Sequence, residues 1–352
     1  MPLPTPNPDE EKDKFIDRCM GNDTMNKEFP DSPQRRAVCE KQWEGEYAEA
    51  LHYPSIVNAV FNQPWAILPE VYGTICELVR ARSLGFRLTA EQVQERIGAK
   101  HVRDGIAKSG AVAILPLYGI LAQRMNMMTQ ISGGTSTEMF GKMVKAAVQE
   151  PSISAIVLDV DSPGGNVFGT DELASEVRAA RETKPIIAVV NSLAASAAYW
   201  VASQASELVV TPGGLVGSIG VLTAHEDVSK AQEMAGVKTT IISAGKYKAE
   251  AIPFASLSAE AQGALQALVD QYYAAFLQAV AKGRGVSLSA VKSGFGQGRL
   301  VNAETALAQG MVDRVATLDQ TIARLIGRGS QGQINADADM DLRQRRLRLS
   351  ST

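Results

Sequence analysis

Short apolar stretches alternate with amphipathic stretches between residues 109 and 327. The apolar stretches have the length of buried strands, and the amphipathic ones carry apolar residues at helical spacing. Strands that alternate with helices form an α/β domain with a largely parallel sheet. We therefore expect strands at 111–121, 155–160, 185–190, 207–211 and 237–243, helices at 136–150, 170–182 and from 258 to the glycines at 283 and 285, and a final helix–strand–helix unit at 302–326.

Three further segments flank this expected 109–327 domain. Residues 1–50 are polar and charged, and residues 51–108 are expected to form a mostly helical extension that ends in a linker. Within that extension, Thr89 is a candidate N-cap for a helix over 89–98. Residues 328–352 are polar with a basic end, RQRRLR, which predicts a disordered basic tail.

Composition argues against several classes of protein. The net charge of −3 gives no overall attraction to nucleic acid, and no apolar run reaches the roughly 18 residues of a membrane span. Three cysteines, Cys19, Cys39 and Cys76, do not make a disulfide framework, so a reducing compartment is expected and a Cys19–Cys39 pair is the less favoured alternative. No residue cluster has metal-ligand spacing and no Walker-type glycine loop is present, so no metal or cofactor is expected.

Ser196 lies where a helix is expected to begin, directly after the apolar run PIIAVV, and alanines flank it on both sides. A serine at the first turn of a helix has its oxygen near the positive end of the helix dipole, and alanines let a substrate backbone come close. This is the arrangement of a nucleophile at a strand–turn–helix junction, although the Gly-x-Ser-x-Gly spelling is absent. An ordinary N-cap serine is the alternative.

Two glycine-containing turns could complete such a site. The turn DSPGG follows the strand expected at 155–160, and Gly164 and Gly165 permit backbone conformations that present N–H groups to an oxyanion. An ordinary strand-to-helix turn is the alternative. In the second turn, TPGGLVGSIGV, the hydroxyl of Ser218 could exchange a hydrogen bond with a base.

A serine nucleophile needs a base. Of the three histidines, His52 and His101 precede the expected sheet, and only His225 follows a strand-like stretch. Lys246 and Lys248, in the segment GKYKAE, could serve instead if burial among apolar groups lowered the pKa of the ammonium. For either lysine, an ordinary solvated side chain is the alternative.

The four pieces SPGG, AAS before an aromatic pair, GSIGV and YKAE, in this order, resemble peptidase family S49, the signal peptide peptidase A type of serine protease. The resemblance runs from about residue 110 to 316, and it implies a ClpP/crotonase-like fold with repeated β-β-α units and a Ser–Lys pair. Carried over by position, Ser196 is the nucleophile and Lys248 the general base. The resemblance further implies that Gly165 supplies an oxyanion-hole N–H, that Gly164 shapes the turn and that Ser218 orients the lysine. Many members read AASGG where this chain has AASAA.

The resemblance also narrows the expected biology. The membrane-bound members carry an N-terminal anchor, which we do not find in this sequence. The spellings GGTSTEMF and ISAGKYKAE are similar to those of soluble members encoded by tailed phages and prophages. They imply a head-maturation protease that cleaves scaffold and capsid-assembly proteins inside the immature head, in the cytoplasm of the bacterial host. They also imply a homo-oligomeric ring with shared active sites, and they make the basic tail a candidate contact with scaffold.

Three alternatives remain at this point. The chain could be a structural capsid component with a decayed site, or a crotonase-like acyl-CoA enzyme, which would bind coenzyme A and not need Lys248. It could also be a Ser–His protease that uses His225. Loss of scaffold cleavage in Ser196→Ala with assembly preserved would argue against the structural component. Binding of coenzyme A without a need for Lys248 would favour the acyl-CoA enzyme, and normal turnover after substitution of His225 would remove the Ser–His protease.

Overall fold

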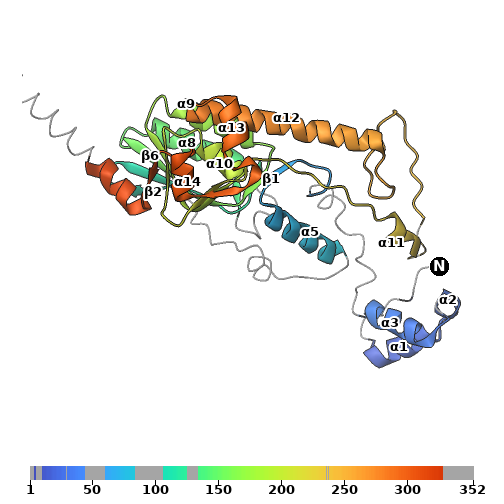
Figure 1. Cartoon of the computed structure of the whole chain (residues 1–352). Helices are drawn as coiled ribbons and strands as arrows, with labels where there is room; N and C mark the ends of the chain where they lie inside the picture. Colours follow the sequence, from blue (N-terminus) through green and yellow to red (C-terminus); the bar gives the residue numbers. More distant parts are fainter. Residues whose placement is uncertain are drawn as a thin grey trace, which may run out of the picture. The chain divides into compact units, whose positions relative to one another are not determined.

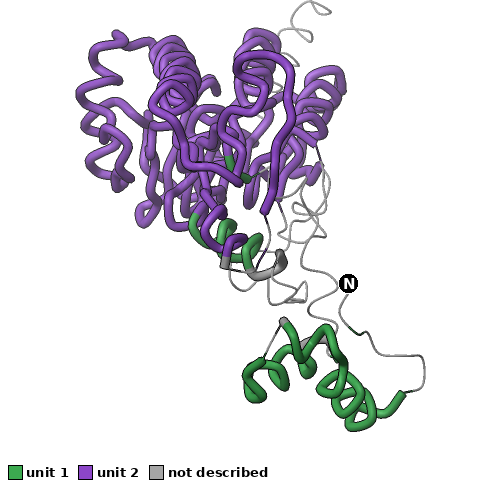
Figure 2. The backbone as a smooth tube through the Cα atoms, turned by 90° about the vertical axis from the view of Figure 1, so that its right-hand side faces the viewer, with its two compact units in different colours: residues 1–61, 73–93 green, residues 62–72, 94–352 purple. Residues whose placement is uncertain are grey.

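A computed structural model describes residue 4 and residues 10–28, 30–43, 60–83, 106–124, 134–234, 236 and 238–327. The chain divides into two compact units, residues 1–61 with 73–93 and residues 62–72 with 94–352 (Figure 2). The helix expected at 89–98, the tail at 328–352, His52 and His101 all lie outside the described residues.

The larger unit is built on a mixed sheet whose centre is parallel (Figure 1). Its described strands are β2 (Ala107–Ser109), β3 (Val112–Tyr118), β6 (Ala155–Ser162), β8 (Ile186–Ala195), β9 (Glu207–Val210), β10 (Leu215–Gly217), β11 (Leu300–Asn302) and β12 (Arg314–Val315). Strands β3, β6, β8 and β9 pair in parallel in that spatial order, and β10 also pairs in parallel with the end of β8. The strands expected at 111–121, 155–160, 185–190 and 207–211 are therefore confirmed.

A smaller sheet has the strand order β1-β7-β4-β5, formed by β1 (Trp65–Ile67), β7 (Gly164–Asn166), β4 (Leu121–Ala122) and β5 (Thr135–Ser136). Along the chain, β3 in the large sheet is followed by β4 in the small sheet and by helix α8 (Thr137–Gln149). Likewise β6 is followed by β7 and by helix α9 (Thr170–Ala180). These repeated β-β-α units confirm the expected α/β class and ClpP/crotonase-like arrangement.

The strand expected at 237–243 is wrong, because residues 238–243 pair with no other strand. The stretch contains β-branched residues that favour extended backbone. However, Ile242 is 96% exposed, so no neighbouring layer covers its apolar side chains. Residue composition alone predicted a strand here, but a β-strand also needs a neighbouring strand with which to form hydrogen bonds.

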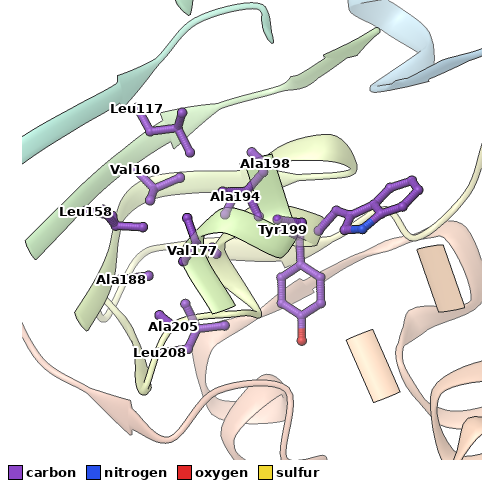
Figure 3. Close-up of a cluster of buried hydrophobic side chains, with 14 of the residues drawn as sticks. Leu117, Leu158, Val160, Val177, Ala188, Ala194, Ala198, Tyr199, Ala205 and Leu208 are labelled. Atoms are coloured by element: carbon purple, nitrogen blue, oxygen red, sulfur yellow. The ribbon is translucent and has the colours of Figure 1, made fainter. Parts of the chain in front are cut away.

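The core of the larger unit lies between the large sheet and its helices, and Figure 3 shows part of it around Tyr199 and Ala198. The remaining helices of this unit are α10 (Ala197–Ala202), α11 (Ser229–Met234), α12 (Ala259–Arg284), α13 (Leu288–Gly294), a 3₁₀ turn (Gly296–Gly298), α14 (Ala303–Ala308) and a helical stretch at 318–327. Ser258 caps α12 by accepting a hydrogen bond from the Ala261 N–H, and Gly285 ends it in the left-handed conformation. No described helix is long and apolar enough to cross a lipid bilayer.

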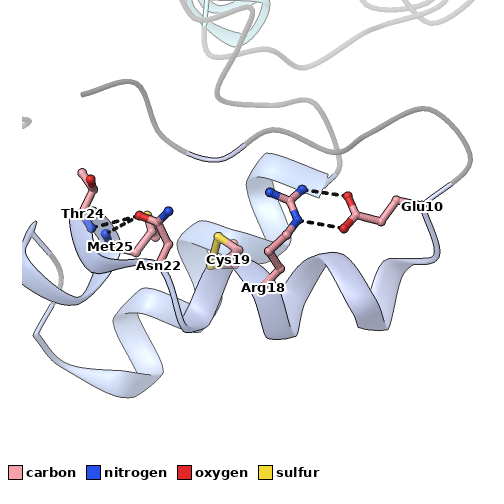
Figure 4. Close-up of a disulfide and its surroundings, with 7 residues drawn as sticks. Glu10, Arg18, Cys19, Asn22, Thr24 and Met25 are labelled. Carbon is pink, nitrogen blue, oxygen red and sulfur yellow. Dashed lines mark hydrogen bonds and ion pairs between the residues drawn. A yellow bond between two sulfur atoms is a disulfide. The ribbon is translucent and has the colours of Figure 1, made fainter.

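The smaller unit contains three short helices, α1 (Lys12–Met20), α2 (Asp23–Glu28) and α3 (Ser32–Trp43), while α5 (Pro69–Ser83) is divided between the two units. Cys19 and Cys39 form a disulfide, and their Cα atoms are 5.8 Å apart (Figure 4). The expectation that these cysteines stay unpaired is therefore wrong, because α1 and α3 pack together and bring them within bonding range. Cysteine count carries no information about that packing.

Candidate active site

Ser196 occupies the single residue between the end of β8 and the start of α10. Its backbone has φ 53° and ψ −117°, a conformation that residues with a side chain rarely adopt. Two hydrogen bonds hold it there, because the Ser196 N–H donates to the Gly217 carbonyl at 2.7 Å and the Trp200 N–H donates to the Ser196 carbonyl at 2.9 Å. Such strain persists only where surrounding structure enforces it, which is common at functional sites.

The Ser196 side chain is completely buried and does not cap α10. Its hydroxyl instead donates to the Gly220 carbonyl at 3.2 Å. The ordinary N-cap alternative is therefore wrong for this serine. A substrate can reach the hydroxyl only if the residues that bury Ser196 move.

Ser218 lies beside Ser196 because strands β8 and β10 pair in parallel with Ala195 opposite Gly217. Ser218 is also buried and also has a positive φ, 51°. Its N–H donates to the Arg299 carbonyl at 2.9 Å, which fixes the strand end. Both serines therefore directly follow the ends of neighbouring parallel strands, and each has a strained backbone conformation.

The turn with Gly164 and Gly165 packs directly against the nucleophile segment. A β-carbon at Gly164, whose φ is +99°, would lie 2.3 Å from the Ala66 carbonyl oxygen and 3.1 Å from the Ala197 nitrogen. A β-carbon at Gly165 would lie 2.0 Å from the Leu121 carbonyl oxygen. Only glycine allows these backbone approaches. The structure thus places Ser218 and the Gly164 turn beside the segment that carries Ser196.

Lys248 is exposed, and among the described residues its ammonium forms no hydrogen bond or ion pair with Ser196 or Ser218. Among the described residues, no apolar side chains enclose Lys248. Lys246 is the poorer candidate base, because hydrogen bonds to Tyr247 and Glu260 raise the pKa of Lys246 above its ordinary value. Its ammonium lies 3.0 Å from the Glu260 carboxylate.

Hydrogen bonds hold together the two ends of the segment that carries Lys248, near residues 227–228 and 253–256. The Val228 N–H donates to the Pro253 carbonyl at 2.7 Å, and the Ser256 hydroxyl donates to Asp227 at 2.8 Å. Hydrogen bonds from Ser229 and Ser256 lower the pKa of Asp227 to about 2, so this anchor is ionised at neutral pH.

His225 is not positioned as a base for Ser196. Its Nδ1 atom lies 3.2 Å from the Asn62 side-chain oxygen. The hydroxyl of Ser196 donates to Gly220 and not to an imidazole. The Ser–His alternative is therefore not assembled in this structure.

The sequence did not predict that backbone groups and strand β1 lie beside the candidate nucleophile. The Ala197 N–H and the Gly220 carbonyl border the nucleophile, and side-chain chemistry gives no signal for either. Strand β1 was missed because residues 51–108 were expected to be helical. The apolar run after Pro64, WAIL, is the one signal that could have revealed it.

Comparison with known proteins identifies the family and the relatives to which this chain is similar. The model of peptidase family S49 matches residues 178–328, which include Ser196, Ser218 and Lys248. Capsid assembly protease C of Escherichia phage lambda is 28% identical over 291 residues. The match covers 78% of this chain and 66% of that protein, so the chain spans just under two thirds of the length of this relative. Among solved structures, a mutant of the 1510-N membrane-bound stomatin-specific protease aligns with a TM-score of 0.41 at 15% identity, covering 62% of this chain and 85% of that one. A Synechocystis sp. protein named "Putative protease slr0021" is 31% identical over 195 residues, covering 55% of this chain and 69% of that protein. The chain belongs to peptidase family S49.

Proposed function

We propose that this chain is a serine endopeptidase with Ser196 as nucleophile and Lys248 as general base. The observation that carries the proposal is the strained, buried Ser196 at the β8–α10 junction, with Ser218 and the Gly164–Gly165 turn beside it. Family membership supports the same roles. An acyl-CoA enzyme or a decayed capsid component would not need a hydroxyl held in this conformation.

In the proposed reaction, neutral Lys248 removes the proton from the Ser196 hydroxyl, which then attacks the scissile carbonyl. The Gly165 N–H stabilises the oxyanion, and Ser218 orients the lysine. The Lys248 ammonium returns its proton to the leaving amine, and an acyl ester forms on Ser196. Lys248 then activates a water molecule that hydrolyses the ester and releases the acid.

The proposed mechanism requires Lys248 to be enclosed by protein. In the single chain it is exposed, and so are its apolar neighbours Ile241, Ile242 and Tyr247. An exposed apolar group of this kind is typical of a contact surface. We therefore propose a homo-oligomeric ring in which a neighbouring copy covers this segment and Lys248 completes the site of another subunit.

The substrate class rests on the phage relative. Because that protein is named a capsid assembly protease, we propose a phage or prophage head-maturation role for this chain. Its substrates would be scaffold and capsid-assembly proteins, cleaved inside the immature head in the host cytoplasm.

The test is co-expression with candidate scaffold and capsid proteins, followed by mass spectrometry of the products. We expect Ser196→Ala and Lys248→Ala to lower cleavage by about 10⁴-fold or more, as loss of a catalytic group does. Lys246→Ala is the matched control, because Lys246 is exposed on the same segment, and it should retain activity. Equal activity of Lys248→Ala and wild type would contradict the proposed base. Cleavage that continues in Ser196→Ala would contradict the proposed nucleophile.

A further inference from the structure

Strand β1 lies in a slot between two other backbone segments, and it is hydrogen-bonded to both. On one side, the Leu68 N–H donates to the Pro163 carbonyl at 3.0 Å, and the Val167 N–H donates to the Pro64 carbonyl at 3.5 Å. On the other side, Trp65 exchanges two bonds with Leu222, at 2.7 and 2.9 Å. Backbone hydrogen bonds along both edges are also how an extended peptide binds when it is added as a strand to a sheet.

In the β1–β7 ladder, a β1 carbonyl accepts the hydrogen bond of the proposed oxyanion donor, the Gly165 N–H. The register pairs Ala66 with Gly165, midway between the hydrogen-bonded pairs 64/167 and 68/163. Because hydrogen-bonded pairs recur every second residue in an antiparallel ladder, Ala66 and Gly165 also form a hydrogen-bonded pair. The Gly165 N–H is thus directed at the Ala66 carbonyl, a peptide carbonyl of the chain itself.

This slot also borders the nucleophile segment. The Ala66 carbonyl oxygen and the Ala197 nitrogen both lie where a β-carbon on Gly164 would be, and the Ser196 hydroxyl donates to the Gly220 carbonyl, two residues before Leu222. Trp65, Ala66 and Ile67 are buried there, and Ser196 is completely buried. A substrate carbonyl that approaches Ser196 between Gly165 and Leu222 would have to occupy the position of β1.

We propose that residues 63–68, QPWAIL, are an intramolecular pseudosubstrate strand that fills the peptide-binding slot and keeps the protease latent. This inference rests on the proposed function. The segment must leave, wholly or in part, before an extended peptide can pair with β7 and residues 222–224. Ala66 stands opposite the oxyanion glycine, so the slot accepts a small side chain at that position of a substrate.

One side-chain and one backbone hydrogen bond hold the N-terminal end of the pseudosubstrate strand and the residue before it. The Thr223 hydroxyl donates to the Gln63 carbonyl at 2.9 Å, and the Asn62 N–H donates to the Ala224 carbonyl at 2.9 Å. The Asn62 amide also donates to the Ala251 carbonyl at 2.9 Å, three residues beyond Lys248. Asn62, the residue directly before the strand, therefore links the strand to the lysine-bearing segment, so release of residues 62–68 would free the slot and that segment together.

A tethered strand is a strong competitor because its effective concentration is on the order of millimolar. A free peptide binds only the fraction of molecules in which the slot is open, and its apparent affinity falls by that fraction. Latency of this kind delays cleavage until an event such as assembly or substrate docking displaces the strand.

A reversible disulfide lock tests the proposal. Trp65 and Asn166 face each other as a non-hydrogen-bonded pair, whose Cα separation of about 4.5 Å suits a disulfide. In the full-length Trp65→Cys/Asn166→Cys variant, the oxidised form should lose reaction with a serine-directed fluorophosphonate probe and regain it after reduction. Wild type with and without reductant is the control for the native disulfide. An oxidised form that reacts as fast as the reduced one would overturn the proposal.

The opposite variant opens the slot. Ala66→Pro removes the N–H that pairs with Gly165, whereas Ala66→Gly keeps it and serves as the matched control. We expect Ala66→Pro to react with the probe about tenfold faster than Ala66→Gly, and equal rates would contradict the pseudosubstrate strand. In a Ser196→Ala background, Ala66→Pro should also increase hydrogen exchange over residues 164–168 and 220–224.

The two measurements separate this inference from the proposed function. If exchange increases but no variant reacts with the probe or cleaves substrate, the strand is displaceable and the proposed peptidase activity is wrong. If the variants react but the locked and open forms do so at the same rate, the peptidase stands and the pseudosubstrate strand is wrong.

Discussion

At the scale of single residues, the site depends on two glycines that backbone atoms crowd. Gly165 is crowded by Leu121 of strand β4, with a hypothetical β-carbon 2.0 Å from that carbonyl oxygen. Backbone atoms cannot rotate away as the end of a flexible side chain can. An added methyl group must therefore push β4 and β7 apart.

We expect Gly165→Ala to lower the free energy of unfolding by about 1–3 kcal/mol, the usual cost of overpacking. Gly213→Ala is the matched control, because a β-carbon there would meet nothing within 4 Å. It should change stability by less than about 0.5 kcal/mol. Urea unfolding of both variants measures the difference, and equal stabilities would contradict the close approach of β4.

The residues with distinctive side chains were predictable, and the backbone groups around them were not. Ser196, Ser218 and the Gly164–Gly165 turn stand out because their residue types and order are unusual. The positions of the Ala197 N–H and the Ala66 carbonyl depend on which strands pair, and this is decided by packing between distant parts of the chain.

At the scale of elements, helix α12 is fixed to the core by an aromatic stack. The rings of Phe276 on α12 and Trp200 on α10 are 4.6 Å apart with an interplanar angle of 9°. Both side chains are fully buried. We expect Phe276→Ala to lower the free energy of unfolding by about 3–5 kcal/mol. The control is Phe168→Ala, which removes a ring that is 39% exposed and should cost much less in the same thermal or urea unfolding experiment.

The C-terminal end of α12 carries a pH-sensitive contact. Arg284 donates two hydrogen bonds to Asp313, at 2.8 and 2.6 Å, and the Leu208 N–H adds a third at 2.7 Å. Burial raises the pKa of Asp313, but the bonds from Arg284 and Leu208 more than offset it, so the net pKa lies below its ordinary value. A lowered folded-state pKa means that the carboxylate stabilises the fold above its unfolded pKa, near 4.

We therefore expect the contribution of Asp313 to disappear as pH falls below about 4, through its folded-state pKa. Asp313→Asn should cost about 1 kcal/mol at pH 7, a value kept small because the side chain is 40% exposed. The cost should shrink at pH 3, because the carboxyl of the unfolded wild-type chain is mostly protonated there and the stabilisation linked to its ionisation falls. Urea midpoints of both proteins at the two pH values measure this, and a cost that stays constant with pH would contradict the ion pair.

At the scale of the whole molecule, the proposed mechanism requires Ser196 and Lys248 to meet, and how they meet decides how many chains would make one active site. The hydroxyl is completely buried in the larger unit, whereas the lysine is exposed on a segment whose Ile242 is almost wholly uncovered. Two arrangements can join them, a closure of that segment within one chain or a contact between copies. The exposed apolar neighbours of the lysine favour the contact between copies.

Mixed assemblies distinguish these arrangements. Ser196→Ala chains retain the lysine and Lys248→Ala chains retain the serine, so each is inactive by itself under both models. If sites form between neighbours, an equal mixture should recover roughly a quarter of wild-type activity, because half of the serines are intact and half of their neighbours supply the lysine. Mixtures in which one partner is the Ser196→Ala/Lys248→Ala double variant should recover nothing. Native mass spectrometry must show that the assemblies contain both variants, and mixed assemblies without activity would contradict a site shared between chains.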